Sequence, residues 1–478
     1  MKKKFLTVVC SVLVCGLLIG CGAGEQNEPT GVGEITQEVV ATSVPEVTEE
    51  PKITETPEAT EAPKATEAPK ATEAPKPTEA PIMMWTPITS EWDGSTLTIS
   101  GNSGVDLRIL GEELAKHGIT KDDLKKVVVS EEVWDINNVF AGCTNLEEIT
   151  LLNHVESIMS SAFKDCTSLK KVSLPASVKQ INDSAFKGCT ELKSIILPEG
   201  LQYIEDSAFF QSGLEDVVFP EGLKCIGDSA FSGCRFTSVT LPDGLERVGY
   251  RAFAFSSFLE DVSLPESLVY IGTEAFCDCS DLKNITLPSN MQCLGSKVFM
   301  NCWELTSEVP EYAYSVTGED EVLFGGWVKG NDKLISFEVP DTLHGKTVVG
   351  IGDGAFDGFD ELIEVKLPKN IRIIEERAFQ NCHELTSIEL PNGVMKIGEN
   401  AFASCYKLEE IVIPEGVTEL GHLAFTDCSG LKKIVIPESV TTIGEWVFNT
   451  YGDVTVYCKK GSYAEEYLKE NGVNYVAE

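Results

Sequence analysis

Thirteen phenylalanines recur in one register along this chain, and most of them are 22 or 23 residues apart. A period of this length is typical of stacked supersecondary units, each of which buries its apolar side only against its neighbours. The sequence therefore predicts one elongated repeat array, a solenoid, over about three quarters of the chain. The column consists of Phe140, Phe163, Phe186, Phe209, Phe231, Phe253, Phe276, Phe299, Phe356, Phe379, Phe402, Phe425 and Phe448.

The repeat aligned on this column reads L-x-x-I-x-L-P-x-x-V-x-x-I-G-x-x-A-F-x-x-C-x-x, and it is clearest from Leu169 to Cys189 and from Leu385 to Cys405. Its first six residues mix inward apolar and outward polar positions at period 2, which predicts a short, half-buried strand. The proline that follows lacks an amide donor and suits the end of that strand. The glycine after the second apolar pair predicts a tight corner, and Ala-Phe fills the interior of each coil.

These motifs resemble the leucine-rich repeats of the BspA-like type, which are found in bacterial surface proteins and secreted virulence-associated adhesins. The resemblance covers about residues 124–450, where proline, glycine, Ala-Phe and Cys recur together at fixed offsets. It implies a β-rich leucine-rich-repeat solenoid with short strands and about 13 repeats of 22–23 residues. Small N- and C-terminal caps and a disordered N-terminal linker complete the predicted architecture.

The regular pattern is interrupted once. Ser307-Glu308-Val309-Pro310 lacks the central apolar residue and brings the proline one position early, and the next copy carries an inserted His344-Gly345-Lys346. We therefore expect a junction between two blocks of repeats. The predicted segments are a signal peptide at 1–20, a Thr/Glu/Ala/Pro/Lys-rich disordered linker at 21–84, an N-terminal cap at 85–123, repeat block 1 at 124–302, an irregular junction at 303–352, repeat block 2 at 353–452 and a C-terminal cap at 453–478.

The two caps have patterns of their own. The segment 92–101 predicts a turn and a strand, and Leu107 to His117 has the apolar spacing of a helix. The segment from Val454 to Val476 resembles the usual carboxy-terminal cap of the BspA-like family. Both are expected because the open ends of a solenoid need covers.

The amino-terminal sequence predicts export from the cytoplasm. Three lysines at positions 2–4 precede an apolar stretch from Phe5 to Ile19, and Leu18-Ile19-Gly20-Cys21 resembles the lipobox of a bacterial lipoprotein signal. The apolar stretch is too short for a comfortable membrane span. The resemblance implies that Cys21 becomes the lipidated amino terminus, on the extracellular face of the bacterial membrane. An ordinary signal peptide with an incidental cysteine is the alternative.

The segment between Cys21 and about Trp85 has almost no core-forming residues and repeats Thr-Glu-Ala-Pro-Lys-Ala. Recurrent proline favours an extended chain, whose reach over roughly 60 residues is about 190 Å, against about 45 Å for a coil. We interpret the segment as a spacer that crosses the cell wall. A disordered linker without a selected length is the alternative.

Composition excludes some classes of function. A formal charge of −37 and a pI near 4.5 argue against nucleic acid as a partner, because phosphate binding needs a basic stripe. The five histidines are scattered, and no metalloprotease helix, nucleophile elbow or phosphate loop occurs. The sequence therefore predicts no enzyme, no catalytic residues, no metal site and no cofactor.

Cysteine forms a second repeat column, which is occupied elsewhere by Ser212, Ser256, Phe359 and Tyr451. Exchange with serine, phenylalanine and tyrosine fits packing better than pairing, so the sequence predicts buried free thiols. Bridges between neighbouring coils remain an alternative, since column mates are near the required Cα distance. The column consists of Cys143, Cys166, Cys189, Cys234, Cys279, Cys302, Cys382, Cys405 and Cys428.

The outward residues of the predicted strands form parallel columns across one sheet. Their hydroxyl, amide and charged groups suit a polar protein surface or a glycan, although such residues are polar on any soluble solenoid. We predict a lipid-anchored surface protein that binds an extracellular protein or glycan, with a structural envelope protein lacking a discrete ligand as the alternative. The candidate ligand-binding residues are Lys171, Ser173, Ser194, Asp216, Ser238, Thr240, Asp261, Ser263, Asn284 and Thr286.

Overall fold

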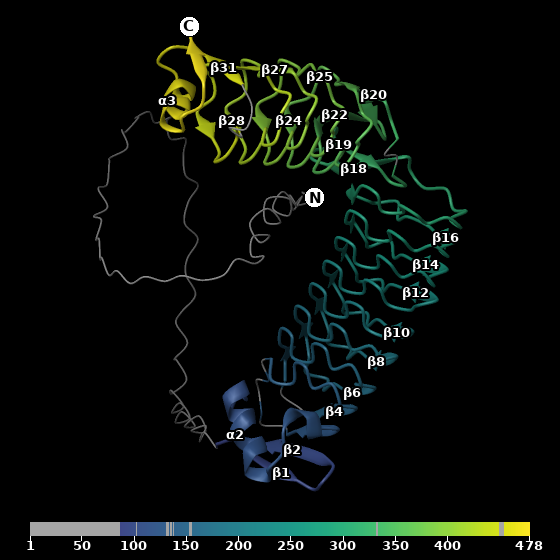
Figure 1. Cartoon of the computed structure of the whole chain (residues 1–478). Coiled ribbons are helices and arrows are strands. Elements are labelled where there is room, and N and C mark those ends of the chain that lie inside the picture. The colour runs from purple at the N-terminus through teal and green to yellow at the C-terminus, as the bar shows by residue number, and fades with distance from the viewer. Residues whose placement is uncertain are drawn as a thin grey trace, which may run out of the picture. The chain divides into compact units, whose positions relative to one another are not determined.

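The computed structural model describes residues 87–478, except for residues 102, 131–132, 134–135, 137, 153–154, 331–332 and 449–453. The predicted signal peptide and linker, with Cys21, lie outside the described residues. In the described part, short strands stack coil upon coil between two terminal caps, as Figure 1 shows. The predicted leucine-rich-repeat solenoid is therefore confirmed.

An N-terminal cap opens the array. Its helix begins where the Ile109 amide donates to the Asp106 carboxylate and ends at Gly118, which has a left-handed φ of 68°. The helix predicted at 107–117 is thus confirmed. β2 pairs in parallel with β3, and β3 with the first strand of the repeats. The cap elements are β1 (Thr89–Trp92), β2 (Thr96–Ser100), α2 (Leu107–His117), the 3-10 helix η2 (Lys121–Asp123) and β3 (Lys126–Val129).

Each regular coil carries a first strand, which comes before the proline of the repeat. These strands form one side of the solenoid, which we call the first-strand face, and they pair in parallel because each coil runs like the one before it. They are β4 (Glu148–Leu151), β6 (Lys171–Ser173), β8 (Ser194–Ile196), β10 (Asp216–Val218), β12 (Ser238–Thr240), β14 (Asp261–Ser263), β16 (Asn284–Ile285), β20 (Ser336–Glu338), β23 (Glu364–Lys366), β25 (Ser387–Ile388), β27 (Glu410–Val412) and β29 (Lys433–Ile436).

A second strand of each coil belongs to one 15-stranded sheet that runs through both repeat blocks. Its regular members are β5 (Ser157–Ile158), β7 (Gln180–Ile181), β9 (Tyr203–Ile204), β11 (Cys225–Ile226), β13 (Arg247–Val248), β15 (Tyr270–Ile271), β17 (Cys293–Leu294), β22 (Lys346–Ile351), β24 (Ile373–Ile374), β26 (Lys396–Ile397), β28 (Glu419–Leu420) and β30 (Thr442–Ile443).

The phenylalanine column forms two stacks inside the coils. All thirteen side chains are buried, and successive rings within each stack lie 4.9–6.4 Å apart between centroids in nearly parallel planes. Full burial of each ring contributes roughly 1.5–3 kcal/mol. The stacks are therefore the main apolar contact between neighbouring coils.

The turn around each phenylalanine makes its own ladder of backbone hydrogen bonds. The Phe163 amide donates to the Ala185 carbonyl of the next coil at 2.8 Å, and the Ser161 and Asp165 amides donate to that coil at 2.9 and 2.7 Å. The amides between them bond locally, as Lys164 does to the Ser161 carbonyl. Ser161 and Asp165 have left-handed φ values of 57° and 59°. This alternation aims every second amide at the next coil.

The glycine that follows the second strand is needed for close packing. At Gly398 an added Cβ would lie 2.6 Å from the Glu375 carbonyl carbon and 2.6 Å from the Glu376 nitrogen in the preceding coil. Gly398 itself does not have a left-handed φ. The predicted explanation, a tight corner, is therefore replaced by close approach of two backbones.

The cysteine column joins coils through thiol hydrogen bonds. None of the thirteen cysteines among the described residues forms a disulfide, in agreement with the prediction from the column pattern. The Cys189 thiol donates to the Phe163 carbonyl of the preceding coil at 3.2 Å, and burial raises the pKa of this thiol to about 12. The same bond recurs at Cys166, Cys234, Cys279, Cys302, Cys382, Cys405 and Cys428.

The junction replaces one regular coil with two hairpins. β18 (Tyr312–Val316) pairs antiparallel with β17 and with β19 (Glu321–Trp327), and β19 pairs in parallel with β22. The inserted tripeptide lies in a hairpin between β21 (Thr342–Leu343) and β22, where His344 and Gly345 have φ values of 50° and 76°. The apolar core divides here into two clusters of buried residues.

The carboxy-terminal cap continues the first-strand face. β31 (Thr455–Cys458) pairs in parallel with β29 and with β32 (Tyr475–Ala477), and α3 (Tyr463–Glu470) lies between them in sequence. The Tyr467 hydroxyl donates to the Gly444 carbonyl at 2.8 Å, which ties the helix to the last regular coil.

The phenylalanine stack predicts a large cost for truncation. Phe231 lies between Phe209 and Phe253 at 5.2 and 5.4 Å. We expect Phe231→Ala to lower the free energy of unfolding by about 3–5 kcal/mol, measured by urea denaturation. Phe255→Ala is the control, because this side chain is 51% exposed and its loss should cost about 0.5 kcal/mol or less. A cost below about 1 kcal/mol for Phe231→Ala would contradict the proposed role of the stack.

Ser256 tests the thiol bond. It stands in the cysteine column, and its buried hydroxyl is the one buried side-chain oxygen or nitrogen of the described residues without a hydrogen-bond partner. The longer C–S bond of Ser256→Cys should reach the Phe231 carbonyl and raise the free energy of unfolding by about 1 kcal/mol. Ser212→Cys is the control, because the Ser212 hydroxyl already contacts the Cys234 thiol at 3.3 Å. Equal effects of the two substitutions would argue against the thiol bond as the cause.

Candidate functional site

The first-strand face presents the predicted ligand-binding columns. Along each strand the central apolar residue points inward and its two neighbours point outward, as the alternation of burial in β12 and β14 shows. Nine of the ten predicted residues are exposed, and Ser173 is half-buried. The structure thus places all ten residues on one side of the solenoid.

The columns do not run across one sheet, and this part of the prediction is wrong. Lys171 and Ser173 belong to a five-stranded sheet that includes the cap, Ser194 and Asp216 to the β8–β10 pair, and the remaining residues to the β12–β14–β16 sheet. The breaks do not follow coil length, because β8 and β10 begin 22 residues apart and pair, whereas β6 and β8 begin 23 residues apart and lie in different sheets.

Six predicted residues line a shallow hollow of about 270 Å³ over β12, β14 and β16, which we call the column groove. Its floor is apolar, because the inward residues of the three strands lie beneath it. Leu264 and Glu266 lie at one end. The six predicted residues are Ser238, Thr240, Asp261, Ser263, Asn284 and Thr286.

Several polar groups of the column groove are held in place. The Asn284 side-chain amide donates to the Asp261 carboxylate at 2.7 Å across the β14–β16 pair. The Glu266 carboxylate accepts from the Ser289 hydroxyl and amide at 2.9 and 3.2 Å. These bonds join neighbouring coils, so the acidic groups are oriented before any ligand arrives.

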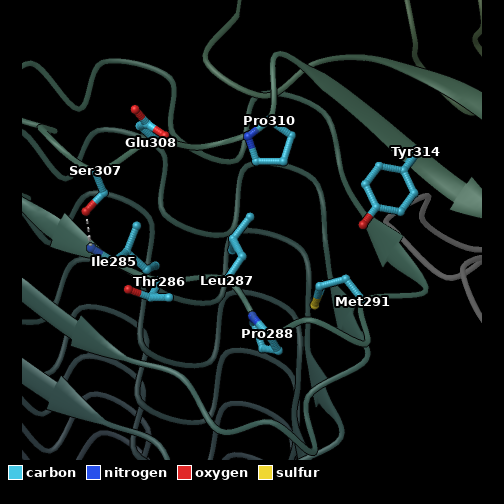
Figure 2. Close-up of a pocket in the computed structure, with 9 residues that line it drawn as sticks. All are labelled: Ile285, Thr286, Leu287, Pro288, Met291, Ser307, Glu308, Pro310 and Tyr314. Atoms are coloured by element: carbon cyan, nitrogen blue, oxygen red, sulfur yellow. Dashed lines mark hydrogen bonds between the residues drawn. The ribbon is translucent and has the colours of Figure 1, made fainter. Parts of the chain in front are cut away.

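A second hollow of about 320 Å³ adjoins the column groove at the end of β16, and we call it the junction pocket. The two hollows share Ile285 and Thr286. Figure 2 shows the pocket between the coil that carries β16 and the segment leading into β18. The other lining residues are Leu287, Pro288, Met291, Ser307, Glu308, Pro310 and Tyr314.

The sequence explains why the pocket opens there. Counted from Cys302, Glu308 stands where Ile285 stands in the preceding coil, at the buried position of the first strand. A carboxylate cannot occupy this position without a large desolvation cost, so Glu308 is exposed and no first strand forms. The Ile285 amide donates to the Ser307 hydroxyl at 3.0 Å in place of a backbone partner. Beyond it, the two coils separate.

The charged residues that line the two hollows are all acidic. Asp261, Glu266 and Glu308 line them, and no lysine or arginine does. Burial raises the pKa of the Tyr314 hydroxyl, so this phenol is neutral and can donate or accept a hydrogen bond. The combination of apolar floor and acidic rim suits a ligand with apolar and cationic groups.

The other predicted residues lie away from the hollows. Lys171 pairs with Glu148 at 2.6 Å, a surface ion pair between neighbouring coils. Ser194 and Asp216 begin β8 and β10, two residues before Ile196 and Val218. These two apolar side chains stand opposite each other in the β8–β10 pair and are 86% and 77% exposed. The structure therefore brings six of the ten residues together.

Apart from Thr286, the residues of the junction pocket were not predicted as ligand-binding residues. The irregular Ser307-Glu308-Val309-Pro310 was visible in the sequence, but no periodicity places Met291 and Tyr314 beside it. Their approach depends on the β17–β18 pairing, in which Leu294 stands opposite Tyr314.

No group of three or more histidine, cysteine or acidic side chains that could hold a metal ion occurs in the described part of the chain. In the same residues, no helix is both long and apolar enough to span a membrane.

A stack of parallel-stranded coils with inward leucine and phenylalanine columns defines a leucine-rich-repeat protein. The chain belongs to the family of the BspA type leucine rich repeat region (6 copies), whose model matches residues 120–232, 206–316 and 330–455. No curated protein matches the chain.

Solved structures of leucine-rich proteins are similar over most of the chain. A leucine rich cell surface protein from Faecalibacterium prausnitzii is 23% identical, with 82% of this chain and 96% of that chain covered and a TM-score of 0.42. A leucine-rich repeat protein from Bacteroides ovatus is 24% identical, with 83% and 100% covered and a TM-score of 0.34. The pneumococcal vaccine antigen PcpA is 19% identical, with 82% and 96% covered and a TM-score of 0.41.

Proposed function

We propose that this protein is a non-enzymatic binding protein of the bacterial cell surface, and that it recognises an extracellular protein or glycan through the column groove and the junction pocket. The observation that carries the proposal is the hollow lined by six outward residues of three successive coils. Rigid strands hold these groups in fixed positions, which lowers the entropic cost of binding.

Position along the solenoid also supports this site. The column groove and the junction pocket are concave and adjoin each other, because both are lined by Ile285 and Thr286. Concave sites remove more of a ligand from water than flat ones. The alternative, a structural envelope protein without a discrete ligand, accounts for the solenoid but not for these hollows.

We further propose that the protein is anchored through a lipid on Cys21 at the extracellular face of the membrane, with the 21–84 segment as a spacer. The support is the lipobox-like Leu18-Ile19-Gly20-Cys21 and the proline-rich composition that follows it. This arrangement would leave the repeat domain accessible to partners outside the cell.

The groove is tested by screening the purified full chain against panels of extracellular proteins and glycans, and by then measuring Kd for each ligand with two matched variants. In the groove variant, four lining residues are replaced together, and we expect Kd to rise at least about tenfold, or about 1.4 kcal/mol. Its substitutions are Ser238→Ala, Thr240→Ala, Asp261→Ala and Thr286→Ala.

The control variant replaces four predicted residues of the same face outside the hollows, and it should change Kd by less than about threefold. Circular dichroism checks that both variants keep their fold. Equal Kd values for the groove variant and the unaltered chain would place the site elsewhere, and a screen without any ligand would favour the structural alternative. The control substitutions are Lys171→Ala, Ser173→Ala, Ser194→Ala and Asp216→Ala.

The anchor is tested in a bacterial host by metabolic labelling with a radioactive fatty acid and by cell fractionation. We expect Cys21→Ala to abolish labelling and to release the protein from the membrane fraction, because the acceptor thiol is gone. Cys15→Ala is the control, since Cys15 lies within the predicted signal peptide, and it should leave labelling intact. Unchanged labelling of Cys21→Ala would refute the proposed anchor.

A further inference from the structure

The junction pocket is a break in an otherwise continuous ladder of coils. The Thr306 amide still donates to the Lys283 carbonyl at 3.0 Å, and bonding resumes where the Val316 amide donates to the Gln292 carbonyl at 2.8 Å and Cys293 stands opposite Ser315. Between these points, no backbone hydrogen bond joins the two coils within the described residues. The pocket therefore opens toward the edge of the apolar core, against which Leu287 and Tyr314 pack.

The walls of the pocket are mixed, with aliphatic side chains beside polar groups of Thr286, Ser307 and Glu308. Leu287, Pro288, Met291 and Pro310 contribute aliphatic surface, and the Tyr314 ring closes the end beyond Met291 in Figure 2. The volume of about 320 Å³ lies at the lower end of the range for ligand sites, roughly 300–1,000 Å³. The pocket thus suits one large side chain or ring.

Polar groups at the pocket are few, and two lack protein partners. Neither the Glu308 carboxylate nor the Tyr314 hydroxyl forms a hydrogen bond or ion pair with another described residue. Glu308 is exposed at the rim. A cationic group placed beside the rim would meet this carboxylate and, further along the column groove, Asp261 and Glu266.

We infer that the junction pocket binds a polypeptide segment in which an apolar side chain is flanked by lysine or arginine. The apolar side chain enters between Leu287, Met291 and Pro310, and the flanking cations face Glu308 and the carboxylates of the column groove. This inference rests on the proposed function and specifies its partner as protein.

The chemistry of the walls favours polypeptide over glycan. Burial of a large apolar side chain contributes roughly 1.5–3 kcal/mol. Sugar hydroxyls placed against the aliphatic part of the walls, Leu287, Met291 and Pro310, would lose water without gaining hydrogen bonds, which is unfavourable. The acidic rim adds attraction for a basic peptide, which weakens as salt increases.

Three blocked pentapeptides serve as probes, with binding to the full chain measured by calorimetry at low salt. They are Gly-Lys-Phe-Lys-Gly, Gly-Glu-Phe-Glu-Gly and Gly-Lys-Gly-Lys-Gly. The first peptide should bind at least about tenfold more tightly than either of the others, because only this peptide supplies both the phenylalanine side chain and the flanking cations. Equal binding of all three, or of the first two, would overturn the inference.

Two variants locate the binding. Glu308→Lys should weaken the first peptide about tenfold or more, whereas Glu304→Lys, a control four residues earlier and outside the pocket, should leave it unchanged. Thr286→Trp should block the pocket from its exposed rim, whereas Thr150→Trp, at the corresponding position on β4, should not. Binding that withstands both Glu308→Lys and Thr286→Trp would overturn the inference.

The two proposals fail in distinguishable ways. A neutral oligosaccharide that binds the full chain and loses affinity in Thr286→Trp would retain the proposed function and overturn the polypeptide inference. Loss of Gly-Lys-Phe-Lys-Gly binding in Glu308→Lys would support the inference whatever the groove variant does. If the groove variant keeps all of its surface partners, the column groove is removed from the proposed function.

Discussion

The turn around each phenylalanine, with left-handed residues two positions before and two positions after the ring, is the constraint on which the rest of the solenoid depends. In this turn every second amide, such as those of Ser161, Phe163 and Asp165, points to the next coil. The ring can then lie directly over the ring of its neighbour. Residues with short polar side chains or glycine fill most of the left-handed positions, because they tolerate positive φ best.

Other fixed positions of the repeat follow from this stacking. Once the turns lie one above another, the backbone after the second strand meets the coil before it, and at Gly398 only glycine fits. The phenylalanine carbonyl then lies within reach of the thiol in the next coil, as in Phe163 and Cys189. The outward positions of the strands carry none of these constraints and are free to differ between coils.

This division explains what could be predicted from the sequence. The strands, buried thiols and cap helix depend on local spacing, and they were predicted correctly, as at Leu107–His117. The separate sheets of the first-strand face were missed, because the inward pattern of the repeat is the same on both sides of each break. The junction pocket was missed because Met291 and Tyr314 meet only through an antiparallel pairing that the repeat does not contain.

The two faces of the solenoid cross the junction differently. On the first-strand face β16 has no following partner strand, whereas the second-strand sheet continues through β17, β18, β19 and β22. A pulling force along the array would therefore pass between the repeat blocks through this sheet and through the turn beside it, where the Lys297 and Phe299 amides donate to the Trp327 and Val328 carbonyls. Because these backbone hydrogen bonds run along the axis of the array, such a force would stretch them lengthwise, while the opposite face can widen at the junction without breaking any strand pair.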